Sequence, residues 1–441
     1  MKKKLTIVPF LGLIAIALVA LFTPTLPDPA LMAENLKNIN TGDTAWVITS
    51  AALVLLMTPG LAYFYGGMVN SKNIVSTMLQ SVIAMAVISV LWVVVGFSLA
   101  FGDDIGGFIG SPSTFFLFKG VLDGPSWSLA PTIPLALFAF FQLKFAIITP
   151  ALITGAFAER IKFTSYVLFI CLFSIFIYAP LAHWTWHPSG FLFGWGVLDF
   201  AGGTVVHMSA GWAALASVIY LKGRSNAEHK PANIPFVLLG TGLLWFGWFG
   251  FNAGSALGAN GLAVSAFATT NTASAAAALA WVFFDSIKGK KPSALGACIG
   301  AVVGLVAITP GAGFVTIPHS IVIGVVASLI SNIVVDWRSK TSLDDTLDVF
   351  PCHGVGGIVG MILTGVFAHQ SVNVANTTGN GLFFGETALF FTHMKALVIV
   401  SAFAFGGSFI LLKVTDLISP LRVSEEEEEL GLDISQHGES I

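Results

Sequence analysis

Charged side chains are scarce in this chain. Only 10% of its 441 residues are Asp, Glu, Lys or Arg, against roughly 25% in an ordinary soluble domain. A soluble fold of this size would need many more charges to cover its surface, so lipid must be the solvent for most of the exterior. The net charge of −3 leaves no basic excess that would point to a nucleic-acid partner.

Cysteine is also scarce, with Cys171, Cys298 and Cys352 as the three examples. All three lie in apolar stretches without the spacing of a metal site, so we interpret them as small buried residues rather than a disulfide framework. The sequence shows no nucleophile–base spacing either, and we expect no metal, no cofactor and no enzyme activity. Glycine, in contrast, is abundant at 46 residues, which is typical of helices that pack closely in a membrane.

The N-terminus has the order of a secretory signal. Three lysines at positions 2–4 precede an apolar run over 5–22, and prolines follow it. We expect residues 1–30 to be a signal peptide that is cleaved near Ala30. An uncleaved signal anchor is the alternative.

The rest of the chain alternates apolar runs with short polar breaks. Each run is long enough to span a bilayer, which takes about 20 residues. The predicted spans are 45–66, 76–101, 132–157, 163–182, 200–221, 234–253, 262–286, 294–310, 317–335, 351–369 and 390–413. The fold class is therefore an all-α polytopic membrane protein with eleven transmembrane helices in a domain over 31–415, followed by an acidic tail over 416–441.

Lysine and arginine are distributed unevenly between the connections. Eleven of them fall in alternate connections, the first to the ninth, at Lys72, Arg160, Lys162, Lys222, Arg224, Lys230, Lys288, Lys290, Lys291, Arg338 and Lys340, against Lys119 and Lys395 in the others. Because positive residues stay in the cytoplasm, we expect the N-terminus outside and the C-terminus inside. The five glutamates of the tail, 425–429, are interpreted on their own as a solvated run.

The candidate pore residues are two histidines inside predicted spans, His207 on the fifth and His353 early on the tenth. Ionisable groups inside a membrane are costly and usually face the interior of the bundle. Neutral imidazole carries one donor and one acceptor, so two stacked rings can line a narrow pore and pass on a small polar molecule. The alternative is that each ring only bonds a neighbouring carbonyl.

Asp199 opens the fifth span, where a carboxylate can cap the helix or favour a cation by its field. Asp348 is expected to cap the tenth span in the same way. Aromatic residues gather near the outer ends of spans three, four and six, at Phe145, Trp186 and Phe251, with Ser255 close by. They form either an aromatic belt or a cation–π cradle, and the sequence alone cannot bring the rings together.

Several long segments, in order, resemble the ammonium transporter (Amt/Mep/Rh) family. They are Tyr-Phe-Tyr-Gly-Gly-Met-Val (63–69), Gly-Ala-Phe-Ala-Glu-Arg (155–160), Asp-Phe-Ala-Gly-Gly-Thr-Val-Val-His (199–207), Gly-Trp-Phe-Gly-Phe-Asn-Ala-Gly-Ser-Ala (247–256), Gly-Ala-Gly-Phe-Val (311–315) and the segment around His353. The resemblance implies a trimer with a pore through each subunit. It also implies two inverted five-helix halves plus one further helix.

The same resemblance assigns roles residue by residue. Phe145 and Phe251 look like the stacked rings of a gate, and His207 and His353 look like the twin histidines of the pore. The list of substrate-binding candidates is Trp186, Phe145, Ser255 and Asp199. The presence of both Trp186 and Ser255 favours the microbial Amt branch, and the tail resembles a cytoplasmic extension that contacts the inner face of the pore and, in many bacteria, a PII-type signal protein.

Two features depart from the family pattern. The segment between Trp186 and Asp199 is one residue longer than the common pattern, which indicates a reshaped external loop. Lys144 is a charge inside the third span, about 100° around the helix from Phe145. It therefore needs a partner or a snorkelling route to water.

We therefore expect an inner (plasma) membrane transporter that recruits ammonium, deprotonates it and conducts ammonia past the histidines, with methylammonium as an analogue substrate. An ammonium sensor of the same fold, signalling through a partner, is the alternative. An ion-coupled transporter for a larger solute would need polar pockets at mid-membrane, and the deep polar groups are the two histidines and Lys144.

Overall fold

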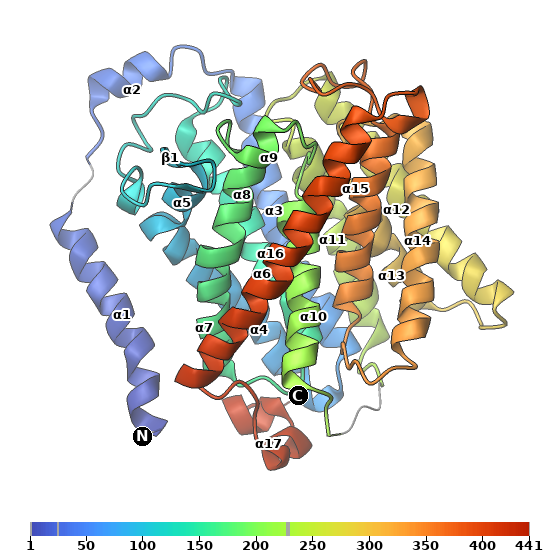
Figure 1. The fold of residues 1–441 in the computed structure, drawn as a ribbon. Coiled ribbons are helices and arrows are strands. Elements are labelled where there is room, and N and C mark those ends of the chain that lie inside the picture. The colour runs from blue at the N-terminus through green and yellow to red at the C-terminus, as the bar shows by residue number, and fades with distance from the viewer. Residues whose placement is uncertain (1, 24–25, 226–229, 441) are drawn as a thin grey trace.

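The computed structural model describes residues 2–23, 26–225 and 230–440. Within these residues, ten helical stretches are long and apolar enough to cross a membrane, and they stand together as one bundle (Figure 1). They are Thr41–Met68, Ser71–Phe101, Leu135–Phe157, Phe163–Gly194, Gly203–Leu221, Ile234–Gly254, Gly261–Ile287, Ile317–Arg338, Phe350–Phe367 and Ala388–Ile418. The chain is a multi-pass, all-α membrane protein, which confirms the fold class expected from composition and periodicity.

Six of these stretches are single helices, and four are composite. The single ones are α3 (Thr41–Met68), α6 (Leu135–Phe157), α11 (Ile234–Gly254), α12 (Gly261–Ile287), α14 (Ile317–Arg338) and α16 (Ala388–Ile418). The composite ones are η1–α4–η2–α5 (Ser71–Asn73, Ile74–Leu91, Trp92–Gly96, Phe97–Phe101), α7–η4–α8–α9 (Phe163–Phe173, Ser174–Tyr178, Ala179–Trp186, Phe191–Gly194), η5–α10 (Gly203–Met208, Ser209–Leu221) and η6–α15 (Phe350–Val355, Gly356–Phe367).

The segment expected as the eighth span is a shorter helix, α13 (Ala294–Ile308). Its 15 residues measure about 22 Å, less than the roughly 30 Å of a hydrocarbon core. It packs against α12 and α14, and most of its side chains are buried. Protein, rather than lipid, therefore surrounds α13, and the order of helical segments matches the eleven that the sequence predicts.

The first helices of the two halves, α3 and α11, pack closely against each other. A Cβ at Gly67 would lie 2.5 Å from the backbone oxygen of Asn233, and one at Gly254 would lie 2.6 Å from Cβ of Ser50. The end of one helix thus meets the start of the other, which makes the pair antiparallel. An inverted repeat requires this arrangement, and glycine allows the backbones to approach so closely.

The last helices of the halves also meet through glycine. A Cβ at Gly211, on α10, would lie 2.2 Å from Cα of Gly354, on η6. Gly211 lies four positions after His207, and Gly354 directly follows His353. The close contact between α10 and η6 therefore brings the two histidine-bearing segments together in the centre of the bundle.

One end of the bundle, which we call the vestibule end, carries long loops. Helix α1 (Lys2–Phe22) stands at the side of the bundle, and α2 (Pro29–Asn35) lies across the top of the view (Figure 1). Asp28 caps α2, and its backbone N–H donates to Asp123 Oδ2. A short antiparallel hairpin of β1 (Asp104–Ile105) and β2 (Ile109–Gly110) lies in the same loop region.

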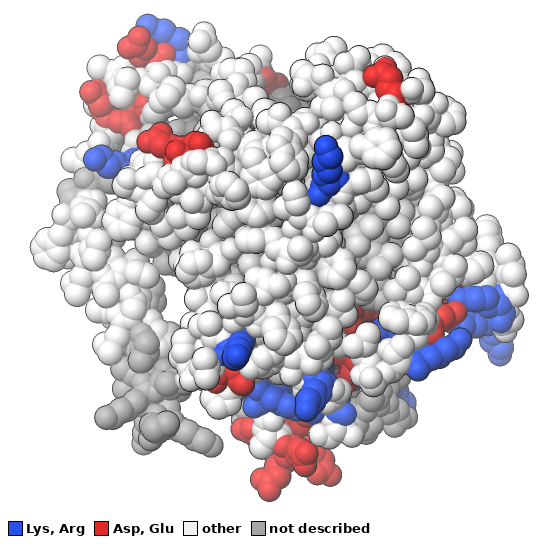
Figure 2. Space-filling model, viewed as in Figure 1, with Lys and Arg blue, Asp and Glu red and all other residues white. Residues whose placement is uncertain are grey.

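The opposite end, which we call the tail end, carries α17 (Glu425–Leu430) and η8 (Asp433–His437). Figure 2 shows Lys and Arg gathered toward this end, with the acidic tail below them, while the middle of the molecule is almost free of charge. The uncharged zone is the band that lipid would cover.

The tail is docked onto the bundle rather than freely solvated. Glu428 is buried, accepts from the backbone N–H of Ser225 at 2.6 Å and pairs with Arg422 at 2.8 Å. Asp433 accepts from the backbone N–H groups of Val75 and Ser76 and so caps the start of α4 (Ile74–Leu91). The interpretation of the five glutamates as a solvated run is therefore wrong for Glu428, because long-range partners bury it.

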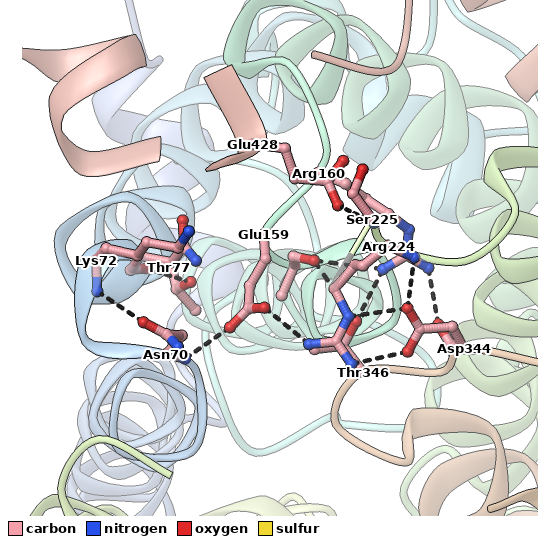
Figure 3. Close-up of polar contacts among 12 residues, drawn as sticks. Asn70, Lys72, Thr77, Glu159, Arg160, Arg224, Ser225, Asp344, Thr346 and Glu428 are labelled. Atoms are coloured by element: carbon pink, nitrogen blue, oxygen red, sulfur yellow. Dashed lines mark hydrogen bonds and ion pairs between the residues drawn. The ribbon is translucent and has the colours of Figure 1, made fainter. Parts of the chain in front are cut away.

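An ionic cluster at the tail end, next to Glu428 of the docked tail, joins four connections (Figure 3). Arg224 contacts Asp344 at 2.8 Å and Glu159 at 2.7 Å, and Glu159 accepts from the backbone N–H of Asn70. Burial alone would raise the pKa of Asp344, but the hydrogen bonds and charge of Arg224 outweigh it and lower the pKa to about 2. Asp344 is thus ionised at neutral pH.

Candidate functional site

His207 and His353 form a stacked pair in the centre of the bundle. Their Nδ1 atoms are 3.3 Å apart, and their ring centroids are 5.4 Å apart at an interplanar angle of 24°. One Nδ1 must donate and the other accept, so the two neutral rings share one proton between them. Both side chains are buried, and Nε2 of His207 has no hydrogen-bond partner among the described residues.

Each histidine lies in a π-helical turn at the start of its span. His207 is the fifth residue of η5, and His353 is the fourth of η6. Single π turns inside α-helices are strained and are frequent at functional sites. The same irregularity in both halves presents the two rings to each other.

The pair lines a narrow apolar cavity. Its other lining residues are Met57, Leu61, Phe64, Ile148, Leu152, Leu244, Trp248, Phe251 and Val302. The cavity volume is about 10 Å³, which is about the room that one water-sized molecule needs. Apart from the imidazole nitrogens and the indole of Trp248, the walls offer no polar side-chain group.

Two phenylalanine rings close this cavity toward the vestibule end. Phe145, on α6, and Phe251, on α11, stack with centroids 4.2 Å apart, and both are fully buried. The ring of Phe251 is also 6.0 Å from His207. The expected gate residues thus meet, and the histidine pair lies directly beneath them.

Trp248 belongs to the same site, although it was not among the predicted residues. Its ring stacks on His207 at 5.3 Å and 21°, and its Nε1 donates to Thr309. Trp248 precedes Phe251 by three positions on α11, a spacing that places both on one helix face. That spacing is the signal from which the sequence could have identified it.

Above the phenylalanine pair lies a larger cavity of about 320 Å³, which we call the vestibule. The four predicted substrate-binding residues Phe145, Trp186, Asp199 and Ser255 all line it. Trp186 ends α8, and its ring meets Phe145 edge-on at 5.9 Å. Ser255 donates its hydroxyl to the backbone oxygen of Phe251, which leaves the lone pairs of Oγ free to accept.

Asp199 acts on its surroundings through hydrogen bonds. Its Oδ1 accepts from the backbone N–H groups of Gly202 and Gly203, and its Oδ2 accepts from the backbone and hydroxyl of Thr204. Its backbone oxygen accepts from Nε1 of Trp186 at 3.0 Å. The carboxylate therefore caps η5, and the same residue orients the vestibule tryptophan.

The expected cap on the tenth span is wrong. Asp345, not Asp348, caps it, since Asp345 Oδ2 accepts from the backbone N–H of Phe350 at 2.7 Å. Asp348 takes a positive φ of 55° and pairs with Arg338 at 2.7 Å. The chain turns between the two aspartates, so the residue nearer in sequence points away from the helix start.

The structure accounts for the two departures from the family pattern, the longer segment after Trp186 and the charge of Lys144. The segment after Trp186 forms the short helix α9 (Phe191–Gly194), and Trp186 still borders the vestibule. Lys144 is half-buried with Nζ 5.8 Å from the ring centroid of Phe140, one turn away. Its partner is therefore an aromatic face, and Lys144 is not among the residues that line the cavity of the histidines or the vestibule.

Comparisons with known proteins agree with this arrangement. The sequence profile described as Ammonium Transporter Family matches residues 45–441. The ammonium transporter of Bacillus subtilis is 46% identical over 402 residues, which cover 90% of this chain and 98% of that protein. A putative ammonium transporter of Methanothermobacter thermautotrophicus is also 46% identical, over 91% of this chain and 98% of that one.

Solved structures give the same result. The crystal structure of Saccharomyces cerevisiae Mep2 matches with a TM-score of 0.84 and 35% identity over 92% of each chain. A structure titled Sensor Amt Protein matches with a TM-score of 0.81 and 29% identity, over 90% of this chain and 98% of that one. The matches cover both halves of the bundle at identities that establish common descent, and this chain belongs to the ammonium transporter family.

Proposed function

We propose that this protein recruits ammonium in the vestibule, removes its proton at the phenylalanine pair and conducts ammonia past His207 and His353. The observation that carries the proposal is the geometry of the histidine pair. Two imidazoles that share a proton line an apolar cavity with room for one small molecule, directly beneath two stacked rings.

Recruitment depends on the aromatic faces and on Ser255. A cation near the face of tryptophan or phenylalanine gains about 0.5–2 kcal/mol, more where water is excluded. Phe145 and Trp186 meet at the floor of the vestibule, and Oγ of Ser255 can accept a hydrogen bond from the ion. Asp199 supports the site by orienting Trp186 and by placing a buried carboxylate beside the vestibule.

Deprotonation follows from the apolar walls beyond the phenylalanine pair. An ion that loses its water there pays several kcal/mol even after relaxation, and no carboxylate lines that cavity to compensate. Ammonia carries no charge and exchanges hydrogen bonds with the imidazoles. The proton either follows along the histidine pair or returns to the vestibule side.

Purified protein in liposomes tests this function. An ammonium gradient should produce ammonia flux, read as a change of internal pH, and an electrical current if the proton follows. Flux without current would reject the electrogenic version alone. Absence of both flux and current in a correctly inserted protein would reject transport.

The alternative is an ammonium sensor of the same fold, and one structural neighbour is titled Sensor Amt Protein. Expression in a host without its own ammonium uptake separates the two readings, because a transporter restores growth on limiting ammonium and a sensor does not. The docked tail is compatible with either.

We further propose a homotrimer in the inner (plasma) membrane, with the vestibule end outside and the tail end facing the cytoplasm and a PII-type protein. The charges gathered at the tail end support the orientation (Figure 2), and family likeness supports the trimer. Residues 1–30 are proposed as a cleaved signal peptide, which sequencing of the mature N-terminus tests.

A further inference from the structure

Two residues that line the vestibule each carry a buried side-chain oxygen without a hydrogen-bond partner in the described part of the chain. Gln142, on α6, is 8% exposed, and Thr185, on α8, is 3% exposed. Within the described residues, Oε1 of Gln142 and Oγ1 of Thr185 have no hydrogen-bond partner. Both residues line the vestibule.

An unsatisfied buried acceptor costs about 1–3 kcal/mol, and such groups need an explanation. Thr185 lies in a helix, where a threonine hydroxyl ordinarily bonds the carbonyl one turn back. Thr149 and Thr241 do so in α6 and α11, but Oγ1 of Thr185 has no such bond to a described residue. Two such exceptions on the wall of one cavity point to a ligand that supplies the missing hydrogen bonds.

The positions of both residues relate them to the recruitment site. Gln142 precedes Phe145 by three positions, so the two share a face of α6. Thr185 directly precedes Trp186 at the end of α8. Oε1 of Gln142 has no partner among the described residues, and rotation of the terminal torsion can turn it toward the cavity.

We propose that Gln142 and Thr185 are substrate-binding residues that accept N–H hydrogen bonds from ammonium and replace its water before it reaches Trp186 and Ser255. This inference rests on the proposed transport function. Ammonium has four N–H donors, whereas methylammonium has three and a methyl group. Oxygen acceptors in addition to Ser255 therefore favour ammonium over methylammonium, which aromatic faces alone do not.

The test is Gln142→Leu and Thr185→Val in liposomes, with KM and maximal rate measured for ammonium and for methylammonium. A hydrogen bond to a charged group is worth about 1.5–3 kcal/mol, so Gln142→Leu should raise the KM for ammonium about tenfold or more. Thr185→Val should raise it about threefold, because a hydroxyl binds more weakly. The ratio of the methylammonium KM to the ammonium KM should fall in Gln142→Leu and in Thr185→Val. Gln142→Glu and Thr185→Ser, which keep an oxygen acceptor, should keep the wild-type ratio.

Gln80→Leu is the matched control. Gln80, on α4, is also buried with an unpartnered Oε1 among the described residues, but it does not line the vestibule. If Gln142→Leu and Thr185→Val keep the KM values and the substrate preference of Gln80→Leu, the inference is overturned. Should Gln142→Leu fail to insert, Thr185→Val against Thr185→Ser decides the question. Inactive wild-type protein would instead reject the proposed function itself.

Discussion

At the scale of single residues, the buried histidines of this protein fall into two kinds. His393 is fully satisfied, because its Nδ1 contacts the backbone oxygen of Met361 at 2.8 Å and its Nε2 accepts from the backbone N–H of Leu198 at 3.0 Å. His207 and His353 contact each other, and Nε2 of His207, beside the cavity, has no partner within the described ranges. Hydrogen-bond satisfaction thus separates a structural histidine from a pair open to a ligand.

This distinction predicts opposite effects of alanine substitution. His207→Ala or His353→Ala should reduce methylammonium uptake at least tenfold or change its selectivity, because the proton-sharing pair is lost, while the thermal midpoint stays near that of the wild type. His393→Ala should cost about 1–3 kcal/mol of stability, because it leaves the N–H of Leu198 unpaired. Uptake and thermal unfolding are measured on all three proteins, and unchanged uptake in both pore variants would return the pair to a structural role.

Asp199 offers a second prediction at this scale. Asp199→Asn replaces an accepting oxygen by an NH₂ group that faces the N–H donors of Gly202 and Gly203 or the N–H and hydroxyl donors of Thr204. We expect a loss of stability of about 1.5–3 kcal/mol and a change in the emission of Trp186, whose Nε1 bonds the same residue. Calorimetry measures the loss of stability. The emission of Trp186 is obtained as the difference between the spectra with and without Trp186→Phe. An unaltered spectrum with full stability would contradict the capping role.

At the scale of elements, Glu428 is the buried member of the five glutamates and, together with Asp433, holds the tail on the bundle. Glu428→Gln should weaken the contacts to Arg422 and to the backbone of Ser225, so the amides of α17 should exchange hydrogen faster. Glu426→Gln, at an exposed position of the same helix, is the matched control and should exchange like the wild type. Equal exchange in the two variants would show that Glu428 does not hold the tail.

The contribution of the Arg224–Asp344 ion pair to the stability of the tail end should not change with pH over the neutral range. The folded pKa of Asp344, about 2, lies below its unfolded value of about 3.9. Its stabilising contribution is therefore complete above about pH 4 and is lost as the pH falls through 2. Exchange at α17 should be equally protected from pH 5 to 8, and loosening within that range would contradict the assignment.

At the scale of the whole molecule, the separation of charge predicts the orientation. Basic residues gather at the tail end (Figure 2), and positive connections remain in the cytoplasm. A fluorescent protein fused after the tail should therefore fluoresce, and alkaline phosphatase inserted beside Lys119 should be active outside. The opposite pattern from both reporters would reverse the proposed orientation.

The sequence by itself determined the apolar segments, their order and the position of His207 and His353 within them, because the length of an apolar run and the cost of a buried ionisable group are local properties. It also determined the family, since long segments match in order. Helix α13 shows the limit of length as a criterion, because protein rather than lipid surrounds it.

Only the tertiary structure decided how distant residues pair. The sequence could not show that Asp345 rather than Asp348 caps the tenth span, that Glu428 is buried or that Trp248 stacks on His207. Nor could it show that Oε1 of Gln142 has no partner among the residues that the structure describes. The cap depends on the backbone turn at Asp348. The other cases depend on how segments far apart in the chain pack together, which no local pattern sets.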